Sequence, residues 1–178
     1  VPEALRLLGE ITEALAVAHR AGVVHRDIKP ENILLSGRHA LVMDFGVAKA
    51  VTEASGRQQL TTAGVALGTP AYMAPEQAMD RAIGPPTDLY SLGVIVYELL
   101  SGRPPFEADT PMGVAYKHVT EPPPRLTAAR PDLAPAFDAL INQAMAKDPA
   151  QRFQTASALL AALERAVSAQ PTQSGVKD

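Results

Sequence analysis

Four polar side chains near the start of the chain have types and a spacing that suit chemistry on a phosphate group. Asp27, Lys29 and Asn32 lie within one short string, HRDIKPEN, and Asp44 follows in the tripeptide DFG. A carboxylate can accept the proton of a hydroxyl group, and an ammonium group can offset phosphate charge. Side-chain oxygens of Asn and Asp are ligands that Mg²⁺ prefers. Because phosphoryl transfer needs mainly alignment and charge neutralisation, these residues predict a phosphoryl-transfer site.

Two longer strings follow these residues in order along the chain. They are GTPAYMAPE, which ends at Glu76, and DLYSLGVIVYELLSG, which begins at Asp88. A single tripeptide such as DFG would carry little information, but the joint order of the four strings is specific. In this order the chain resembles the catalytic lobe of a eukaryotic-type (Hanks-type) serine/threonine protein kinase. The strings GTPAYMAPEQ and DPAQRFQTASAL are most similar to bacterial members of that family, and the resemblance extends from Pro2 to about Val167.

The resemblance implies a role for each polar residue of the first two strings. Asp27 would accept the proton of the substrate hydroxyl, and Asn32 and Asp44 would bind Mg²⁺. Lys29 would lie beside the γ-phosphate of ATP, and a lysine at this place is typical of the serine/threonine class. Leu34 would form the floor under the adenine ring, although the same leucine could simply belong to the core. The implied cofactors are Mg²⁺ and ATP, and the implied partners are protein substrates.

Further residues would regulate or support this site. Arg26 would receive a phosphorylated residue, and Thr61 and Thr62 lie where such phosphosites occur in the family. The alternative is that both threonines are ordinary solvated residues of a polar loop. Thr69 would bind back toward Asp27 and Lys29 and line the substrate pocket after the phosphoacceptor. Structural roles are implied for His25 and Phe45 in an apolar stack, for Asp88 as the anchor of the HRD backbone, and for Glu76 paired with Arg152.

The elements that must position these groups follow from apolar periodicity. Residues 2–19 predict an amphipathic helix, and residues 88–100 predict an apolar helix buried in the middle of the fold. Two short buried strands, 33–35 and 40–43, predict a hairpin whose ends bring Asn32 and Asp44 together. Further helices are predicted at 111–119, 133–147 and 155–167, the last with Thr155 as its N-cap.

The predicted fold class is therefore mainly α. It is a protein-kinase-like C-terminal lobe, a helical bundle with a small catalytic β-hairpin, and the N-terminal β-lobe is absent from the chain. Residues 47–67 are rich in small polar types and predict a long surface loop, and residues 121–131 predict a proline-rich loop. We expect one incomplete kinase domain over 1–167 and a polar tail or linker over 168–178.

Composition excludes several other classes of function. The chain has 178 residues, 47% of them hydrophobic and 20% charged, which suits one globular domain with a core. The net charge is −3 and the basic residues are dispersed, so a nucleic-acid partner is not expected. There is no cysteine, which excludes a thiol nucleophile and fits a cytoplasmic location. The strongest apolar stretch, residues 92–100, is too short to span a bilayer, although the parent protein could be tethered to a membrane.

The chain contains no G-x-G-x-x-G loop with a following V-A-I-K lysine, the parts that cover and hold ATP in this family. We therefore expect the chain to be inactive without the missing N-terminal lobe, which would be its partner. One alternative is a kinase-like interaction module that binds a partner through its substrate platform or through the apolar face left bare by the missing lobe. The other is a truncated reading frame without a function of its own. We also expect self-association through that bare face. The intact residues Asp27, Lys29, Asn32 and Asp44 favour an enzyme over an interaction module.

Overall fold

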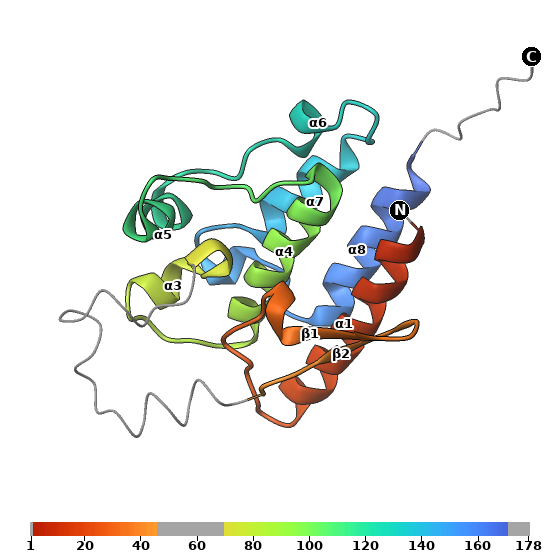
Figure 1. Cartoon of the computed structure of the whole chain (residues 1–178), viewed down its shortest axis with the longest axis horizontal. Helices are drawn as coiled ribbons and strands as arrows, with labels where there is room; N and C mark the ends of the chain where they lie inside the picture. Colours follow the sequence, from red (N-terminus) through yellow and green to blue (C-terminus); the bar gives the residue numbers. More distant parts are fainter. Residues whose placement is uncertain (1, 46–69, 171–178) are drawn as a thin grey trace, which may run out of the picture.

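The computed structural model describes residues 2–45 and 70–170, which form a mainly helical fold with one small hairpin (Figure 1). The mainly α class predicted from the sequence is confirmed. The helices and strands are α1 Pro2–Arg20, β1 Ile33–Ser36, β2 His39–Val42, α3 Pro75–Ala78, α4 Pro85–Ser101, α5 Pro111–Thr120, α6 Leu126–Ala129, α7 Ala136–Ala144 and α8 Ala156–Ser168. Short 3₁₀ turns occur at Pro30–Asn32, Pro70–Tyr72 and Pro149–Gln151.

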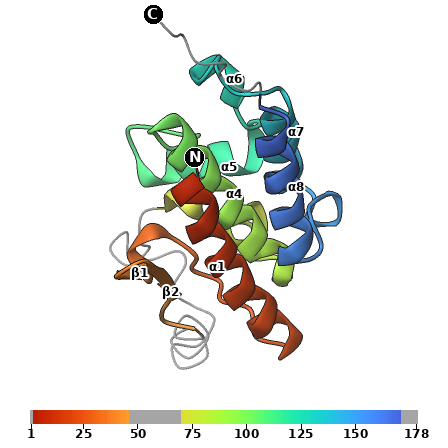
Figure 2. The ribbon, with the colours of Figure 1, turned by 90° about the vertical axis from the view of Figure 1, so that its right-hand side faces the viewer.

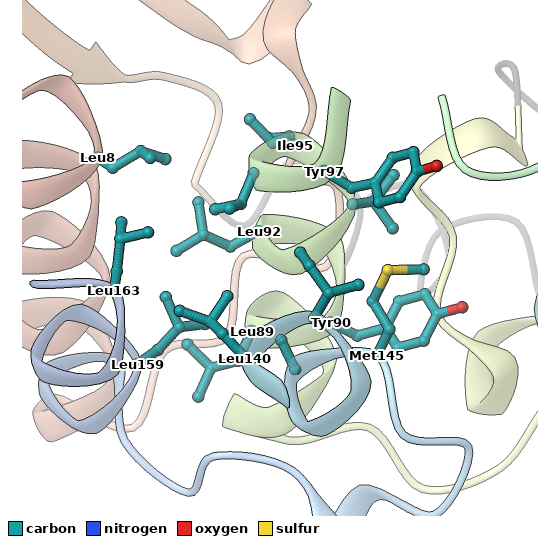
Figure 3. Close-up of a cluster of buried hydrophobic side chains, with 14 of the residues drawn as sticks. Leu8, Leu89, Tyr90, Leu92, Ile95, Tyr97, Leu140, Met145, Leu159 and Leu163 are labelled. Carbon is teal, nitrogen blue, oxygen red and sulfur yellow. The ribbon is translucent and has the colours of Figure 1, made fainter. Parts of the chain in front are cut away.

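Helix α4 is the centre of the core. It is apolar on nearly every side, so it can be stable only when other elements surround it. Leu89 and Leu92 point from α4 towards α1 and α8, whereas Tyr90 and Tyr97 project from the opposite side of the helix (Figure 3). The helix ends at Gly102, whose φ of 80° is the left-handed conformation that glycine adopts most readily. The burial predicted for this segment is confirmed.

Helices α1 and α8 lie side by side and form one flank of α4 (Figures 1 and 2). Leu8 of α1 and Leu163 of α8 are both buried between these helices and α4. On α1 the buried residues Leu8, Ile11 and Leu15 recur at steps of three and four, which is the spacing of one helical face. The predicted amphipathic helix is confirmed, with Arg20 as its last residue.

The β-hairpin corrects one prediction, because its strands are not buried. Ala40 is buried next to α1, where Glu10 accepts a hydrogen bond of 2.6 Å from the Ala40 amide. In contrast, Leu34, Leu35 and Leu41 expose 48%, 60% and 49% of their surface. A two-stranded sheet has two faces, and α1 is the described helix that makes the most extensive contact with it, through β2. The apolar sequence therefore indicated a surface suited to burial without showing what covers it.

Three other features can be compared with the element boundaries predicted from the sequence. Helix α7 is shorter than predicted, because Pro135 precedes it and the chain turns at Met145 before the 3₁₀ turn that begins at Pro149. The proline-rich segment includes the single helical turn α6. Thr155 caps α8 as predicted, since its hydroxyl accepts a hydrogen bond of 3.2 Å from the Ala158 amide. Within the described residues, no helix combines the length and hydrophobicity that crossing a membrane requires.

We predict that Gly93→Ala destabilises the protein. A Cβ atom at Gly93 would lie 2.8 Å from the Cβ of Ala144 and 3.2 Å from the Cγ of Met145, so α4 and α7 would have to move apart. Overpacking of this kind costs about 1–3 kcal/mol, which exceeds the gain of about 1 kcal/mol from alanine's better helix propensity. Urea unfolding should therefore give a lower free energy of unfolding for this variant.

Gly9→Ala in α1 is the matched control, because a Cβ at Gly9 meets no atom within 4 Å. This variant should be more stable than the wild type by about 0.5–1 kcal/mol, the gain expected from helix propensity alone. Equal effects of the two substitutions would show that α4 and α7 are not in close contact at Gly93.

Candidate active site

The backbone that precedes Asp27 is held by a buried carboxylate. Asp88, in the first turn of α4, is 1% exposed. Its two oxygens accept hydrogen bonds from the amides of His25 (2.9 Å) and Arg26 (2.8 Å). The Nε2 atom of His19 lies 2.7 Å from Oδ2 of the same carboxylate. A buried charge is tolerated only when it is well partnered, and these three groups satisfy that condition.

Two residues next to this anchor have strained backbones. Arg26 and Asp44 adopt φ angles of 72° and 63°, in the left-handed region that residues other than glycine rarely occupy. Each such residue costs on the order of 1–3 kcal/mol and persists only when its surroundings hold it in place. Strain of this kind is concentrated at functional sites. The two residues flank the loop and the strand end that carry the predicted catalytic groups.

His25 links the HRD string to the DFG string. Its ring is fully buried, with Nε2 at 2.6 Å from the Met43 carbonyl and Nδ1 accepting a hydrogen bond of 3.2 Å from the Asp27 amide. Because Nδ1 is an acceptor, we assign the ring proton to Nε2, which donates it to Met43. The His25 ring also packs edge-on against Phe45, with centroids 4.8 Å apart. The structure thus brings His25 and Phe45 into the contact that the sequence predicted.

The Asp27 carboxylate is accessible and polarised on one side. Its side chain is 49% exposed, and Oδ2 lies 2.8 Å from the Lys29 ammonium. Asn32 donates from Nδ2 to this Oδ2 (3.0 Å) and to the Asp27 carbonyl (2.7 Å). Lys29 and Asn32 thus both contact Oδ2 of the Asp27 carboxylate, whereas Oδ1 makes no hydrogen bond to any described residue. As far as the described residues go, Oδ1 is available to accept a proton from a hydroxyl group.

Asn32 and Asp44 fit the oxygen donors that Mg²⁺ requires. The Nδ2 atom of Asn32 is used by Asp27, so its Oδ1 is left without a hydrogen-bond partner in the described part of the chain. The hairpin pairs Ile33 with Val42, and the Met43 amide donates to the Asn32 carbonyl (2.9 Å). This pairing places Asn32 beside the segment that leads to the exposed Asp44.

The described residues do not by themselves form a complete metal site. Among the described residues no group of three His, Cys, Asp or Glu side chains could enclose an ion. Two oxygen ligands nevertheless fit Mg²⁺, which keeps several water ligands and takes further oxygens from substrate phosphates. Leu34 lies on β1 opposite Leu41, and both are exposed. An apolar surface is therefore adjacent to the candidate metal ligands.

A second buried carboxylate, Glu76, anchors the end of the segment that follows residue 69. Arg152 donates to both of its oxygens, each at 2.7 Å, and the Thr87 hydroxyl donates at 2.7 Å. The guanidinium also reaches the carbonyls of Ala146, Pro86 and Lys147, so this buried pair is fully hydrogen-bonded. Burial acts to raise the pKa of Glu76, but the hydrogen bonds from Arg152 and Thr87 outweigh it, so the pKa lies below its ordinary value.

The predicted regulatory residues are only partly visible. Thr61, Thr62 and Thr69 lie outside the described residues, so their roles stay predictions. Arg26 is half-buried, and its Nε atom is buried without a hydrogen-bond partner among the described residues. Such an unpaired donor would suit an anionic group.

The structure also reveals polar contacts that the sequence did not predict. The Gln77 side chain reaches the Arg26 carbonyl (2.6 Å), and His19 reaches Asp88. The Tyr72 hydroxyl donates a hydrogen bond to Glu98 (2.6 Å). Burial and this carboxylate raise the pKa of Tyr72. In the sequence, the only indication of these contacts was that Tyr72 lies within the GTPAYMAPE string and that Gln77 directly follows it. His19 gave no signal beyond its helical pattern.

Comparison with known proteins identifies the family of this arrangement. A model described as "Protein kinase domain" matches residues 2–162. The serine/threonine-protein kinase pkn3 of Myxococcus xanthus is 44% identical over 167 residues, which cover 90% of this chain and 30% of that protein. The serine/threonine-protein kinase PknB of Mycobacterium tuberculosis is 41% identical over 171 residues, which cover 96% of this chain and 27% of that protein.

A solved structure shows the same similarity in three dimensions. The crystal structure of the Mycobacterium tuberculosis PknI kinase domain superposes with a TM-score of 0.69 and is 27% identical, covering 93% of this chain and 55% of that chain. The chain thus spans about half of the solved domain and less than a third of the two relatives. These matches confirm the resemblance inferred from the motifs.

We predict that Glu76→Gln destabilises the protein in a pH-dependent way. Loss of one partner leaves Arg152 buried without its counter-charge, which costs about 3–5 kcal/mol near neutral pH. A carboxyl group with a lowered folded-state pKa contributes stability above its unfolded pKa of about 4.5, and this contribution is lost as the pH falls through the folded value. The difference in unfolding free energy between wild type and variant should therefore shrink below about pH 4.5.

The measurement is urea unfolding between neutral pH and about pH 3. Glu164→Gln, on the exposed side of α8, is the control and should change stability by less than about 0.5 kcal/mol. A wild-type-to-variant difference that is independent of pH would contradict the assignment of the charged pair.

Proposed function

Because the chain belongs to the protein kinase domain family, we propose that it supplies the catalytic and substrate-binding half of a serine/threonine protein kinase. The reaction is transfer of the γ-phosphoryl group of ATP to a Ser or Thr hydroxyl of a protein. The observation that supports this most directly is the Asp27 carboxylate, whose Oδ2 is contacted by Lys29 and Asn32 and whose Oδ1 accepts no hydrogen bond from a described residue. In this geometry Asp27 takes the proton of the acceptor hydroxyl at Oδ1.

The remaining polar groups act on the nucleotide. Asn32 and Asp44 would hold Mg²⁺, which would offset negative charge on the phosphates of ATP. Lys29 lies 2.8 Å from Asp27 and adds a positive charge where the transferring group meets the base. Leu34 offers an apolar floor to the adenine ring. These groups lie on a rigid base, because Asp88 and His25 fix the loop and the strand end that carry them.

The proposal extends to regulation. Phosphate on Thr61 or Thr62 would bring nearly two negative charges, and the unpaired Nε of Arg26 is a donor that such a group could use. Thr69 would contribute to the pocket for the acceptor residue, next to Lys29. A cytoplasmic location of this lobe fits the absence of cysteine from the chain.

The exposed apolar face of the hairpin supports a partner. Leu34 and Leu41 are paired across the hairpin, lie on one face and are 48% and 49% exposed. Met43 and Phe45, which follow Leu41 along the chain, are 39% and 38% exposed. We propose that a kinase N-terminal lobe covers this face and holds ATP from above. The same exposed face supports the second candidate function, a non-catalytic module that docks another protein. The presence of Asp27, Lys29, Asn32 and Asp44 together favours the enzyme.

We predict that Asp27→Asn in a protein that contains this chain and an N-terminal kinase lobe lowers kcat by about 10²-fold or more. The KM for ATP should stay within about threefold, since Asp27 acts on the acceptor hydroxyl rather than on the nucleotide. Steady-state phosphorylation of a peptide substrate measures both constants. Glu13→Gln, an exposed acid-to-amide change on α1, is the control and should behave like the wild type. Wild-type turnover in Asp27→Asn would refute the role of the base.

We predict that the 178-residue chain by itself neither binds ATP at millimolar concentration nor phosphorylates itself or a basic protein. It has no Gly-rich loop to cover the phosphates, so the nucleotide would meet only the face around Leu34 and the metal ligands. Aligned geometry can supply on the order of 7–11 kcal/mol of a barrier, and most of that alignment would be lost. Calorimetry and radioactive-phosphate labelling test both statements.

The same sample should self-associate in analytical ultracentrifugation, because the hairpin face is exposed. The control is an Asp27→Asn sample, because any labelling that persists in it comes from contaminating kinases. A monodisperse monomer that labels substrate only when Asp27 is intact would overturn the proposal that a second lobe is needed.

A further inference from the structure

The side chain of Gln77 connects two segments that lie far apart in the sequence. Its Oε1 accepts a hydrogen bond of 3.0 Å from the Ala74 amide, at the start of α3. Its Nε2 donates a hydrogen bond of 2.6 Å to the carbonyl of Arg26, in the loop that carries Asp27. One amide group thus joins α3 to the catalytic loop.

Helix α3 is a fixed support for this contact. Glu76, the residue before Gln77, is held by Arg152 through two hydrogen bonds of 2.7 Å. Both partners of that ion pair are almost completely buried, so the start of α3 cannot shift without breaking it. The Gln77 side chain therefore extends from a position set by the core of the lobe.

The carbonyl that Gln77 contacts belongs to Arg26, the residue directly before Asp27. Arg26 has a φ of 72°, so its backbone leaves this conformation unless it is held. Asp88 holds its amide at 2.8 Å, and Gln77 holds its carbonyl. That carbonyl belongs to the peptide plane between Arg26 and Asp27, so the hydrogen bond restricts rotation of the plane from which the Asp27 side chain extends.

We propose that Gln77 is a positioning residue for phosphoryl transfer, which sets the orientation of Asp27 by holding the Arg26 carbonyl. The inference rests on the proposed role of Asp27 as the base. It also means that the end of the GTPAYMAPE string and the catalytic loop form one unit, joined by Gln77 on one side and Asp88 on the other.

The competing interpretation is that Gln77 only caps α3, through the Ala74 amide. Gln77→Glu separates the two interpretations, because a carboxylate still accepts from Ala74 but cannot donate to Arg26. Gln77→Leu removes both hydrogen bonds. The matched control is Gln154→Glu, the same change at a glutamine whose Nε2 also donates to backbone carbonyls, those of Pro149 and Arg152.

The first measurement is amide hydrogen exchange in the 178-residue chain. The Arg26 and Asp27 amides should exchange about tenfold faster in both Gln77 variants than in the wild type, and should be unchanged in Gln154→Glu. The Ala74 amide should remain protected in Gln77→Glu and lose its protection in Gln77→Leu. Wild-type exchange at Arg26 and Asp27 in Gln77→Glu would overturn the inference.

The second measurement is turnover in a protein that contains this chain and an N-terminal kinase lobe. Gln77→Glu should lower kcat by about three- to tenfold, with the KM for ATP unchanged. Because the carboxyl group introduced by this substitution can donate to Arg26 once it is protonated, the ratio of variant to wild-type kcat should rise as the pH is lowered towards about 5. A variant with the kcat of the wild type would refute the positioning role.

Asp27→Asn is measured in parallel to separate this inference from the proposed function. If the wild type is no more active than Asp27→Asn, the proposed function fails. The exchange rates at Arg26 and Asp27 then still decide whether Gln77 holds the loop.

Discussion

The candidate active site depends on one constraint, the burial of the Asp88 carboxylate in the first turn of α4. This helix is surrounded by the core, so Asp88 cannot move without repacking α1, α7 and α8. A buried carboxylate must be partnered, and its partners are His19 and the amides of His25 and Arg26. The need to satisfy this charge therefore fixes the backbone from which Asp27 extends.

The site combines a buried support with exposed reactive groups. Asp88 and Glu76 are buried carboxylates with complete sets of partners, whereas Asp27 and Asp44 are exposed. Groups that act on a substrate must be accessible, and accessible side chains are precise only when buried neighbours hold their backbones. The left-handed conformations of Arg26 and Asp44 persist because this support opposes their relaxation.

The sequence predicted correctly those features that depend only on residues close together in the chain. The amphipathic α1 and the apolar α4 were evident from periodicity, because a helix with one or all faces buried carries that pattern in its own residues. The strands of the hairpin were located correctly, but their burial was predicted wrongly. Leu34, Leu35 and Leu41 are apolar whichever element covers them, and a pattern within two strands cannot specify that element. The end of α7 was missed because the turn at Met145 retains helical composition.

The sequence by itself determined the family, since the order and spacing of HRDIKPEN, DFG and GTPAYMAPE are those of protein kinases and the match to the protein kinase domain confirms it. It also identified Glu76 and Arg152 through family resemblance. Only the tertiary structure showed that Gln77 reaches Arg26 and that His19 reaches Asp88, over separations of 51 and 69 residues. The physical reason is that a hydrogen bond needs two atoms within about 3 Å. Between distant segments, the packing of the whole core around α4 sets that distance, and no local pattern records it.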